Sequence, residues 1–447
     1  MKMMKRMLAF LLMLVMCCSL TACKKDEPAD AGVVVPEGVM LIVGDYELTR
    51  EKYEEYLATL TNYYANYGYD ASTDASLAQM LQQFALQTGI EYAVLDQKLV
   101  ELGLALTDEE KAAAKESAKA EWDATVEEGL AYYGITAEST EEERSTTLVS
   151  VLAELESMGY TEESYVEDTV VFAGYDKLFA HVTKDVTVTE EDVLNHYNTL
   201  VEADKAEYEN NAAAYEQDAY TNQMYAMYGM TDYVTEIYYK PAGYRLVTHI
   251  LLEASEELLT AYTDLQAAYE EQQNTIEEGG EVTGELVTEA EIENARLAIL
   301  ADVQPQVDEI NQKLAEGATF AELIPLYSTD PGMMDEAAIA AGYEVHMDCT
   351  NWVIPFRDQA FTVSNIGDVT APVVTDYGVH IIQYVADVPG GPVELTEEMR
   401  ASFYDSLLST AQNEKYSAAI AEWVEAAEVV YSDEAKAILG TTEEAAQ

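Results

Sequence analysis

The chain has very few cysteines. There are four in 447 residues, and three of them, Cys17, Cys18 and Cys23, lie close together near the N-terminus. If these three belong to an export signal, the fourth, Cys349, has no intramolecular partner. We therefore expect no disulfide framework, so the stability of the folded chain must come from packing.

Basic residues are scarce as well. Lysine and arginine number 23 against 84 aspartates and glutamates, which gives a net charge of −61. A field of this sign repels nucleic acid and anionic lipid head groups, so nucleic-acid binding is excluded. The same field attracts basic, unfolded segments of other proteins. An acidic surface that only keeps the chain soluble explains the composition equally well.

Sequence motifs for metals and nucleotides are also missing. His181, His196 and His346 are scattered without the spacing of zinc ligands. The chain has no Gly-Lys-Ser/Thr phosphate loop, no Gly-x-Ser-x-Gly nucleophile elbow and no Asp-x-Asp-x-Asp-Gly calcium loop. We expect neither a cofactor nor a metal ion.

The N-terminus has the features of a lipoprotein signal peptide. Basic residues precede an apolar run over residues 7–15 that is too short to span a bilayer, and small residues lead up to Cys23. In such signals the cysteine is acylated and the chain is cut before it. We expect residues 1–22 to be removed and Cys23 to carry lipid, such as palmitate. Residues 23–36 would then tether the protein to the extracytoplasmic face of the cell membrane.

The region after the tether is predicted to be mostly helical. A short strand over residues 39–43 precedes a helix that begins near Thr49, and further helices follow. Several of them begin with a threonine whose hydroxyl can cap the first turn, followed by acids that the helix dipole favours. We predict a helical chaperone-like domain over residues 37–243. The capping threonines are Thr107, Thr140, Thr161 and Thr189.

Residues 201–240 are rich in tyrosine, methionine, asparagine and glutamine. Tyrosine offers a large apolar face with few rotatable bonds, and methionine adapts to irregular partners, so such a surface could hold many different unfolded segments. The same side chains could instead pack the helical domain, since residues 62–69 also use tyrosine freely. Both interpretations stay open at the level of sequence.

Two strand-like runs each carry a histidine. His249 lies within residues 244–252, and His380 lies within residues 375–382. Between them, Asp330 follows a Tyr-Ser-Thr phrase and precedes Pro-Gly, and the phrases Gly-Ala-Thr-Phe-Ala-Glu-Leu, Trp-Val-Ile-Pro-Phe and Ile-Gly-Asp-Val occur in order along the same stretch. This series resembles the parvulin peptidyl-prolyl isomerases.

The resemblance implies a small antiparallel sheet flanked by helices over residues 244–388. It also implies a site in which His249 and His380 form a buried hydrogen-bonded pair and Asp330 lies near the substrate carbonyl. The histidines could instead be ordinary core residues, and Asp330 could be only the first residue of a turn before Pro-Gly. The predicted substrate-binding residues, of which the aromatic ones would form a cup for proline, are Trp352, Phe356, Phe361 and Thr375.

The sequence departs from the parvulin pattern in two places. Residues 255–312 are longer than the helix that the family has there, and the glycines within them indicate an inserted helical hairpin. After Asp330, the family's Gly-Gly-Asp-Leu-Gly phrase is replaced by Ala-Ala-Gly-Tyr-Glu over residues 340–344. The family pattern therefore leaves one wall of the pocket unassigned.

The segments on either side of the predicted parvulin domain resemble the PrsA and SurA foldases. In those families a C-terminal helical segment, here residues 389–447, returns to complete the N-terminal domain. The expected fold class is α+β: a mostly helical N-terminal chaperone domain completed by a C-terminal helix, with an inserted parvulin domain built on a small antiparallel sheet.

Together these features predict a membrane-anchored foldase that isomerises X-Pro bonds in secreted proteins and assists their folding. Its partners would be unfolded, proline-containing proteins and the membrane, and it could form a homodimer. One alternative is a holdase chaperone whose parvulin domain has lost activity. Another is a surface lipoprotein that binds a ligand or partner through its tyrosines.

Overall fold

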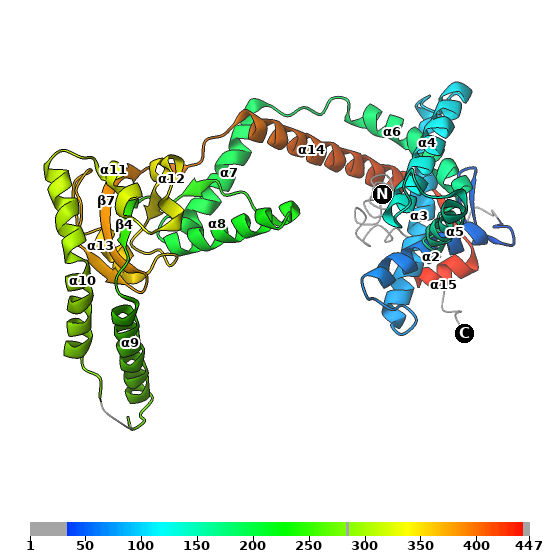
Figure 1. Cartoon of the computed structure of the whole chain (residues 1–447). Helices are drawn as coiled ribbons and strands as arrows, with labels where there is room; N and C mark the ends of the chain where they lie inside the picture. The colour runs from blue at the N-terminus through cyan, green and yellow to red at the C-terminus, as the bar shows by residue number, and fades with distance from the viewer. Residues whose placement is uncertain (1–33, 283–285, 441–447) are drawn as a thin grey trace. The chain divides into compact units, whose positions relative to one another are not determined.

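The chain divides into two compact units. The computed structural model describes residues 34–282 and 286–440, so the expected signal peptide, Cys23 and most of the tether lie outside the described residues. One unit, which we call the helical unit, runs up to Val188 and resumes at Tyr404. The other, which we call the sheet unit, is Thr189–Phe403. Figure 1 shows the elements of both units by label and colour.

The helical unit is built mainly from capped helices. The side chains of Thr107, Thr140 and Thr161 accept hydrogen bonds from backbone N–H groups in the first turn, as the sequence predicts, and Thr189 caps the first helix of the sheet unit in the same way. No described helix is both long and apolar enough to cross a membrane. The elements are β1 (Val39–Val43), β2 (Tyr46–Thr49), α2 (Arg50–Asn66), α3 (Ala75–Glu101), α4 (Asp108–Tyr132), α5 (Glu141–Ser157), α6 (Glu162–Thr183), the later turns of α14 (Glu397–Ala426), β9 (Val429–Tyr431) and α15 (Asp433–Leu439).

The C-terminal segment completes the helical unit from Tyr404 on, whereas residues 389–403 of the segment predicted to do so belong to the sheet unit. β1 pairs antiparallel with β2 on one side and with β9 on the other, so strands from both ends of the chain share one sheet. Tyr416 and Ile420 of α14 are buried together with Leu95 of α3 and Leu178 of α6. Apolar burial of this kind is the main force that holds the returning segment in place.

The sheet unit contains a four-stranded antiparallel sheet in the order β5-β4-β7-β6. This arrangement confirms the predicted fold class. The elements are α7 (Glu190–Tyr208), α8 (Ala212–Met227), η2 (Thr231–Tyr233), β3 (Tyr239–Lys240), β4 (Tyr244–Leu252), α9 (Glu256–Glu277), α10 (Glu289–Ala315), α11 (Phe320–Tyr327), η3 (Pro331–Met333), α12 (Glu336–Ala341), β5 (Tyr343–Val345), α13 (Ile354–Ala360), β6 (Val373–Thr375), β7 (Gly378–Val388), β8 (Gly391–Pro392) and the first turns of α14.

The two faces of this sheet bury different residues because side chains alternate along a strand. On one face, Ile250 of β4 and Ile381 of β7 pack against apolar side chains of α10 and α11. On the other face, Val247 and Ile382 pack against Phe356 of α13. The second face also carries His249 and His380, so the register of β4 against β7 decides where the histidines point.

Residues 189–243 belong to the sheet unit, which differs from the predicted helical domain over residues 37–243. The reason is aromatic packing across the proposed boundary. Tyr215 of α8 lies with its ring 5.9 Å from that of Tyr244 at the start of β4, and the Tyr244 hydroxyl donates to the Glu216 carboxylate at 3.2 Å. These contacts fix α7 and α8 to the sheet, whereas sequence periodicity shows only that they are helices.

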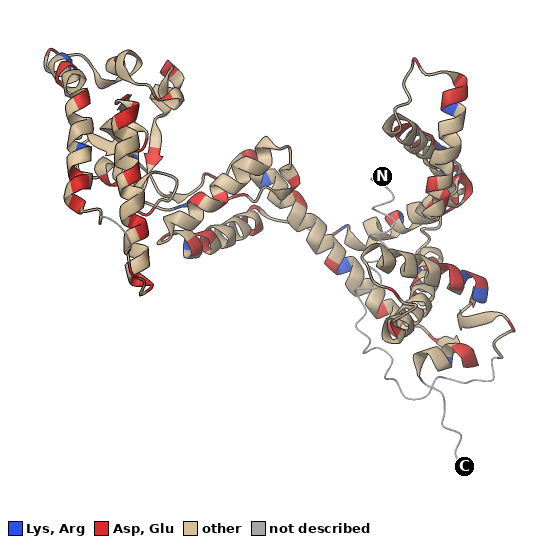
Figure 2. Ribbon diagram, turned by 60° about the horizontal axis from the view of Figure 1, so that its bottom comes forward, with Lys and Arg blue, Asp and Glu red and all other residues tan. Residues whose placement is uncertain are grey.

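α9 and α10 follow β4 in the chain, where the sequence predicts a helical insertion over about residues 255–312, and they lie side by side (Figure 1). The end of the hairpin is joined by polar contacts, in which Gln272 exchanges hydrogen bonds with the backbone of Val287 at 3.2 and 3.0 Å. The inner ends are apolar, with Tyr262 of α9 and Ile299 of α10 buried in the sheet core. Acidic side chains far outnumber basic ones on the ribbons of both units (Figure 2).

Gly378 at the start of β7 is required by its surroundings. Its φ is +136°, and a Cβ there would lie 2.5 Å from the carbonyl oxygen of Leu252 on β4. We predict that Gly378→Ala destabilises the sheet by about 2–4 kcal/mol, because it adds both backbone strain and overlap with a neighbouring strand. Hydrogen exchange measured by mass spectrometry should show faster exchange in peptides that cover residues 244–252 and 378–388.

Gly367→Ala is the matched control. Gly367 also has a positive φ, of +94°, but a Cβ there would meet nothing within 4 Å. Only the conformational cost of about 1–2 kcal/mol is expected. Equal exchange rates in the two variants would show that the close approach of Gly378 to β4 does not matter.

Candidate active site

The two histidines meet in the middle of the sheet. His249 faces Ile382 across the β4–β7 ladder, and His380 lies two residues from Ile382 on the same face. The two Nδ1 atoms are 2.9 Å apart, the rings are stacked at 5.0 Å, and each residue is at most 5% exposed. The structure therefore brings together the buried pair that the sequence resemblance implies.

Asp330 closes one end of this pair. Its Oδ2 accepts a hydrogen bond from His249 Nε2 at 2.7 Å. The backbone after α11 places it there, because Thr329 donates its N–H to the Leu251 carbonyl on β4 at 2.9 Å. Asp330 also caps the turn that follows, since its Oδ1 accepts from the N–H of Gly332. The Asp330 side chain therefore both caps this turn and belongs to the candidate site.

Thr375 closes the other end. Its hydroxyl lies 2.8 Å from Nε2 of His380, and Thr375 is buried at the end of β6. The carboxylate can only accept, so His249 Nε2–H donates to Asp330. The two Nδ1 atoms share one hydrogen bond, and the Thr375 hydroxyl is hydrogen-bonded to Nε2 of His380. The result is a continuous row of hydrogen bonds across the sheet.

The ionised group in this row of hydrogen bonds is Asp330, which lies at the more exposed end. Hydrogen bonding to His249 holds the pKa of the Asp330 carboxyl well below its usual range, although partial burial opposes this shift. Burial lowers the pKa of His380 to about 3, and the neighbouring His249 adds to the shift. The interior of the site therefore holds the neutral imidazole of His380, whereas the ionised carboxylate of Asp330, which is 15% exposed, lies at the other end of the row.

Phe356 covers the histidine pair. It is 2% exposed, and its ring meets those of His249 and His380 edge to face at 5.2 and 5.1 Å. Trp352 lies beside it at 5.4 Å and donates its indole N–H to the Glu344 carbonyl. Trp352 and Phe356 therefore form one aromatic wall beside the two histidines.

Phe361 occupies a different position from the other predicted cup residues. It follows α13, and the guanidinium of Arg245 lies 4.5 Å from its ring centroid. Arg245 also lies over the ring of Tyr384 and donates to the carbonyls of Ala360 and Val363. Phe361 packs against the cluster that contains Phe356, with a cation–π contact to Arg245 on its ring.

Tyr343 is a site residue that the sequence analysis missed. Its hydroxyl donates to Oδ2 of Asp330 at 2.7 Å, and its ring lies 5.5 Å from His249 and 4.8 Å from Trp352. It comes from the phrase that replaces Gly-Gly-Asp-Leu-Gly in this chain. No local sequence signal identifies it, because its contact with Asp330 is made only in the folded domain, where a Cβ at Gly332 would lie 2.1 Å from the Tyr343 oxygen.

Cys349 does not have the environment of a nucleophile. It is fully buried next to Phe356, and burial raises the pKa of its thiol, which favours the unreactive protonated form. The described residues contain no cluster of His, Cys, Asp and Glu suited to hold a metal ion. The chemistry of the site therefore rests on a hydrogen-bonded row beneath an aromatic cover.

Comparison with known proteins agrees with this geometry. Residues 295–388 match the family described as PPIC-type PPIASE domain. This part of the chain is a parvulin-type domain. The match begins within α10, so β4 and His249 lie outside the matched residues although β4 belongs to the same sheet as β7.

Foldase proteins are among the relatives of the chain. Foldase protein PrsA 2 of Listeria monocytogenes is 35% identical over 121 residues, which are 26% of this chain and 39% of that protein. Foldase protein PrsA of Oceanobacillus iheyensis is 26% identical over 240 residues, which are 52% of this chain and 67% of that protein. The chain thus spans about two fifths of the length of the first of these curated relatives.

A SurA-like chaperone structure from Campylobacter jejuni is 16% identical, and the alignment covers 69% of this chain and 95% of that one. The TM-score is 0.27, which is too low to establish a shared arrangement of the whole chain. The catalytic roles of His249, Asp330 and His380, and the substrate-binding roles of Trp352, Phe356, Phe361 and Thr375, stay predictions.

The depressed pKa of His380 has a measurable consequence. The unfolded chain binds a proton at His380 near pH 6.5, whereas the folded parvulin domain binds it near pH 3. Between these values the unfolded state holds more protons, so the contribution of His380 to the free energy of unfolding is complete above pH 6.5 and is lost as the pH falls. We predict that the His380 imidazole stays neutral down to about pH 4 in the folded protein.

An NMR titration of the full chain with labelled histidine tests this prediction. The variant His380→Gln identifies the His380 resonance among those of the five histidines. A resonance that shifts with a midpoint near 6.5, while the backbone spectrum stays that of the folded protein, would contradict the buried neutral state.

Proposed function

We propose that this chain is a foldase whose parvulin domain isomerises X-Pro peptide bonds in other proteins. The observation that supports this most strongly is the hydrogen-bonded row Thr375–His380–His249–Asp330 beneath Phe356. Family membership of residues 295–388 and the similarity to PrsA foldases point to the same activity.

The geometry suits a reaction that needs no covalent intermediate. Rotation about a peptide bond is opposed by about 18–20 kcal/mol, because resonance gives the C–N bond double-bond character and places negative charge on the carbonyl oxygen. At a right-angle twist this charge is smaller. The ionised Asp330 and the apolar wall of Trp352 and Phe356 disfavour the charged carbonyl of the planar state, so the twisted state gains relative stability.

The altered phrase after Asp330 supports an active site rather than a degenerate one. In its place, Tyr343 contributes a hydroxyl to Asp330 and a ring that packs on Trp352. The pocket wall that the family pattern left unassigned is therefore built from other residues. A holdase without isomerase activity is the second candidate, and the large exposed tyrosine and methionine side chains of the sheet unit favour it.

We further propose that the protein acts outside the cytoplasm, anchored through lipid on Cys23, with newly secreted proteins as its clients. The basic start, the short apolar run and the small residues before Cys23 support this location. The PrsA relatives are foldases by name, which is consistent with such clients.

Removal of Phe356 should impair catalysis. We predict that Phe356→Ala lowers kcat/KM for an X-Pro peptide by about tenfold or more, since each 1.4 kcal/mol of lost transition-state stabilisation is about a factor of ten. Because this truncation can cost about 3–5 kcal/mol of stability, Phe356→Leu, which keeps much of the volume, is measured in parallel. The readout is isomerisation followed by NMR exchange spectroscopy on the full chain.

Cys349→Ala is the matched control, because Cys349 belongs to the same buried cluster as Phe356 but is not a member of the hydrogen-bonded row. It should retain most of the activity. If the wild type shows no rate above the uncatalysed reaction but still suppresses aggregation of an unfolded client, the holdase function replaces the proposed one. If Phe356→Leu, Asp330→Ala and the wild type have equal rates above background, catalysis occurs elsewhere.

Anchoring predicts a specific effect of Cys23→Ala. Without the thiol no lipid can be attached, so the protein should accumulate as an uncleaved precursor or be released to the medium. Metabolic labelling with palmitate and fractionation of expressing cells measure this directly. Normal processing and membrane association in the variant would rule out the lipoprotein assignment.

A further inference from the structure

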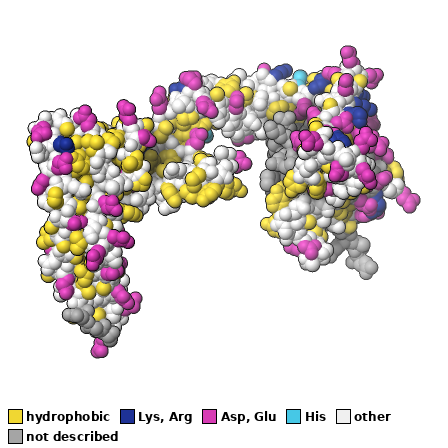
Figure 3. Space-filling model, viewed as in Figure 1, with side chains coloured by type: hydrophobic (Ala, Val, Ile, Leu, Met, Phe, Trp, Pro, Cys, Tyr) yellow, Lys and Arg dark blue, Asp and Glu magenta, His cyan; other side chains and the backbone are white. Residues whose placement is uncertain are grey.

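Large apolar side chains are exposed on α8 and on the turn that follows it. Tyr220, Met227, Tyr228 and Tyr233 are 52%, 65%, 69% and 64% exposed. In Figure 3, hydrophobic side chains gather along this helix. We call these four residues the α8 face. Contiguous apolar surface of this kind is typical of an interaction site rather than of a merely soluble helix.

The α8 face is held in a defined shape. Residues 220, 227 and 228 lie on one side of the helix because their spacing matches its turn. The following segment folds back on the helix, since Asn222 exchanges hydrogen bonds with the backbone of Thr235 and the ring of Tyr233 lies 5.8 Å from that of Tyr225. A partner would therefore meet a preformed surface.

α8 is fixed to the parvulin domain close to its site. Glu216 is 7% exposed, and burial raises the pKa of its carboxyl, while the Tyr244 hydroxyl and the backbone N–H groups of Thr350 and Asn351 partly offset that rise. Asn351 directly precedes Trp352 of the aromatic wall. The buried end of α8 thus touches the loop that carries part of the candidate active site.

The surroundings of the α8 face are acidic. No lysine or arginine occurs between Lys205 and Lys240, whereas six carboxylates do. A second copy of this chain would bring the same negative charge, which disfavours self-association through this face. An occupant with basic residues is complementary to it in charge.

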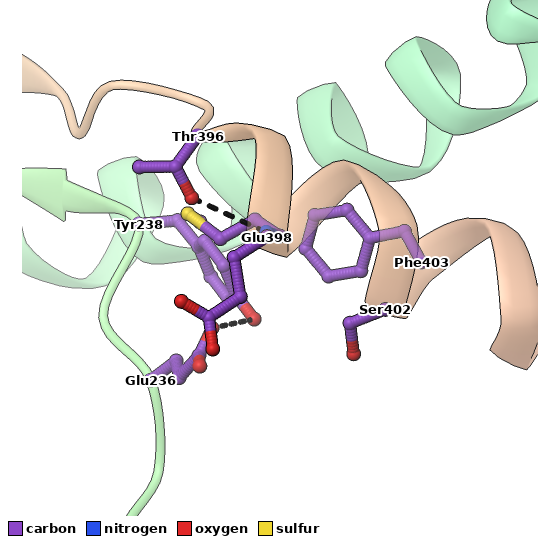
Figure 4. A pocket seen from close by; sticks show the side chains of 7 residues that line it. Glu236, Tyr238, Thr396, Glu398, Ser402 and Phe403 are labelled. Atoms are coloured by element: carbon purple, nitrogen blue, oxygen red, sulfur yellow. Dashed lines mark hydrogen bonds between the residues drawn. The ribbon is translucent and has the colours of Figure 1, made fainter.

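A pocket of about 370 Å³ lies at the end of the same segment. The carboxylates of Glu236 and Glu398 and the rings of Tyr238 and Phe403 all line it (Figure 4). Aromatic rings and carboxylates in one pocket suit the side chain of lysine or arginine, whose aliphatic stem packs on aromatic rings while the charged end pairs with carboxylate. The remaining lining residues are Thr396, Met399 and Ser402.

We propose that the α8 face and this pocket together bind extended polypeptide segments that combine apolar and basic residues, and hold them beside the isomerase site. This inference deepens the proposed foldase function and rests on it. α8 is about 24 Å long, which corresponds to about seven residues of extended chain. The substrate class is therefore an unfolded, positively charged segment rather than an isolated X-Pro dipeptide.

Binding of a proline-free peptide tests the surface separately from catalysis. The probe is a fluorescent peptide of about ten residues with alternating lysine and leucine, and its partner peptide has glutamate in place of lysine. Fluorescence anisotropy with the full chain should show that the lysine peptide binds at least about tenfold more tightly than the glutamate peptide. Binding of the lysine peptide should weaken about tenfold when the four residues of the α8 face are replaced together, as Tyr220→Ser, Met227→Ser, Tyr228→Ser and Tyr233→Ser. It should weaken several-fold in the double variant Glu236→Gln, Glu398→Gln.

The matched control replaces exposed residues of the helical unit, Tyr67→Ser, Tyr132→Ser and Val149→Ser, which are 67%, 85% and 68% exposed. It should bind like the wild type. The proposal would be overturned if both sets of substitutions weakened binding equally, or if the lysine peptide bound no more tightly than the glutamate peptide. It would also be overturned if light scattering showed a dimer that the α8 substitutions convert to a monomer. The α8 set should keep the rate for a short X-Pro peptide; loss of that rate in the wild type itself would instead contradict the proposed isomerase.

Discussion

The site depends on the antiparallel register between β4 and β7. These strands lie far apart in the sequence, and His249 and His380 are separated by 131 positions. The register sets His249 opposite Ile382 and Leu251 opposite His380, so both imidazoles point to the same face. A slip of one residue in either strand would turn its histidine toward the apolar layer of α10 and α11 and leave a polar ring buried there without its partner.

The hydrogen-bonded row also shows how a polar group is kept inside an apolar sheet at low cost. Each imidazole nitrogen of the pair has a partner, so burial does not leave a donor or acceptor unsatisfied. The ionised member, Asp330, lies at the rim, where water and the Tyr343 hydroxyl also reach it. The charged Asp330 at the rim and the neutral His380 in the interior together make the site stable. The same arrangement keeps the site polar toward a substrate carbonyl.

The parts that the sequence predicts are those with local signals. Capping threonines such as Thr107 and Thr140 interact with residues three positions on, so they can be identified from the sequence alone, and the phrases around His249 and His380 identify the parvulin sheet. Tyr343 could not be predicted in this way, because its bond to Asp330 depends on how a variable loop returns to the site. The assignment of α7 and α8 to the sheet unit likewise depends on Tyr215 and Glu216 meeting Tyr244, a contact that helical periodicity does not show.

The pairing of β1 with β9 has a consequence for the order in which the chain can fold as it is synthesised or exported. β1 has only β2 beside it until residues 429–431 emerge, so the three-stranded sheet of the helical unit cannot close before almost the whole chain is present. The sheet unit needs nothing beyond Phe403 and is available earlier. As the chain emerges from N-terminus to C-terminus, the sheet unit with the candidate isomerase site can therefore fold first, and the helical unit, which needs β9, is completed last.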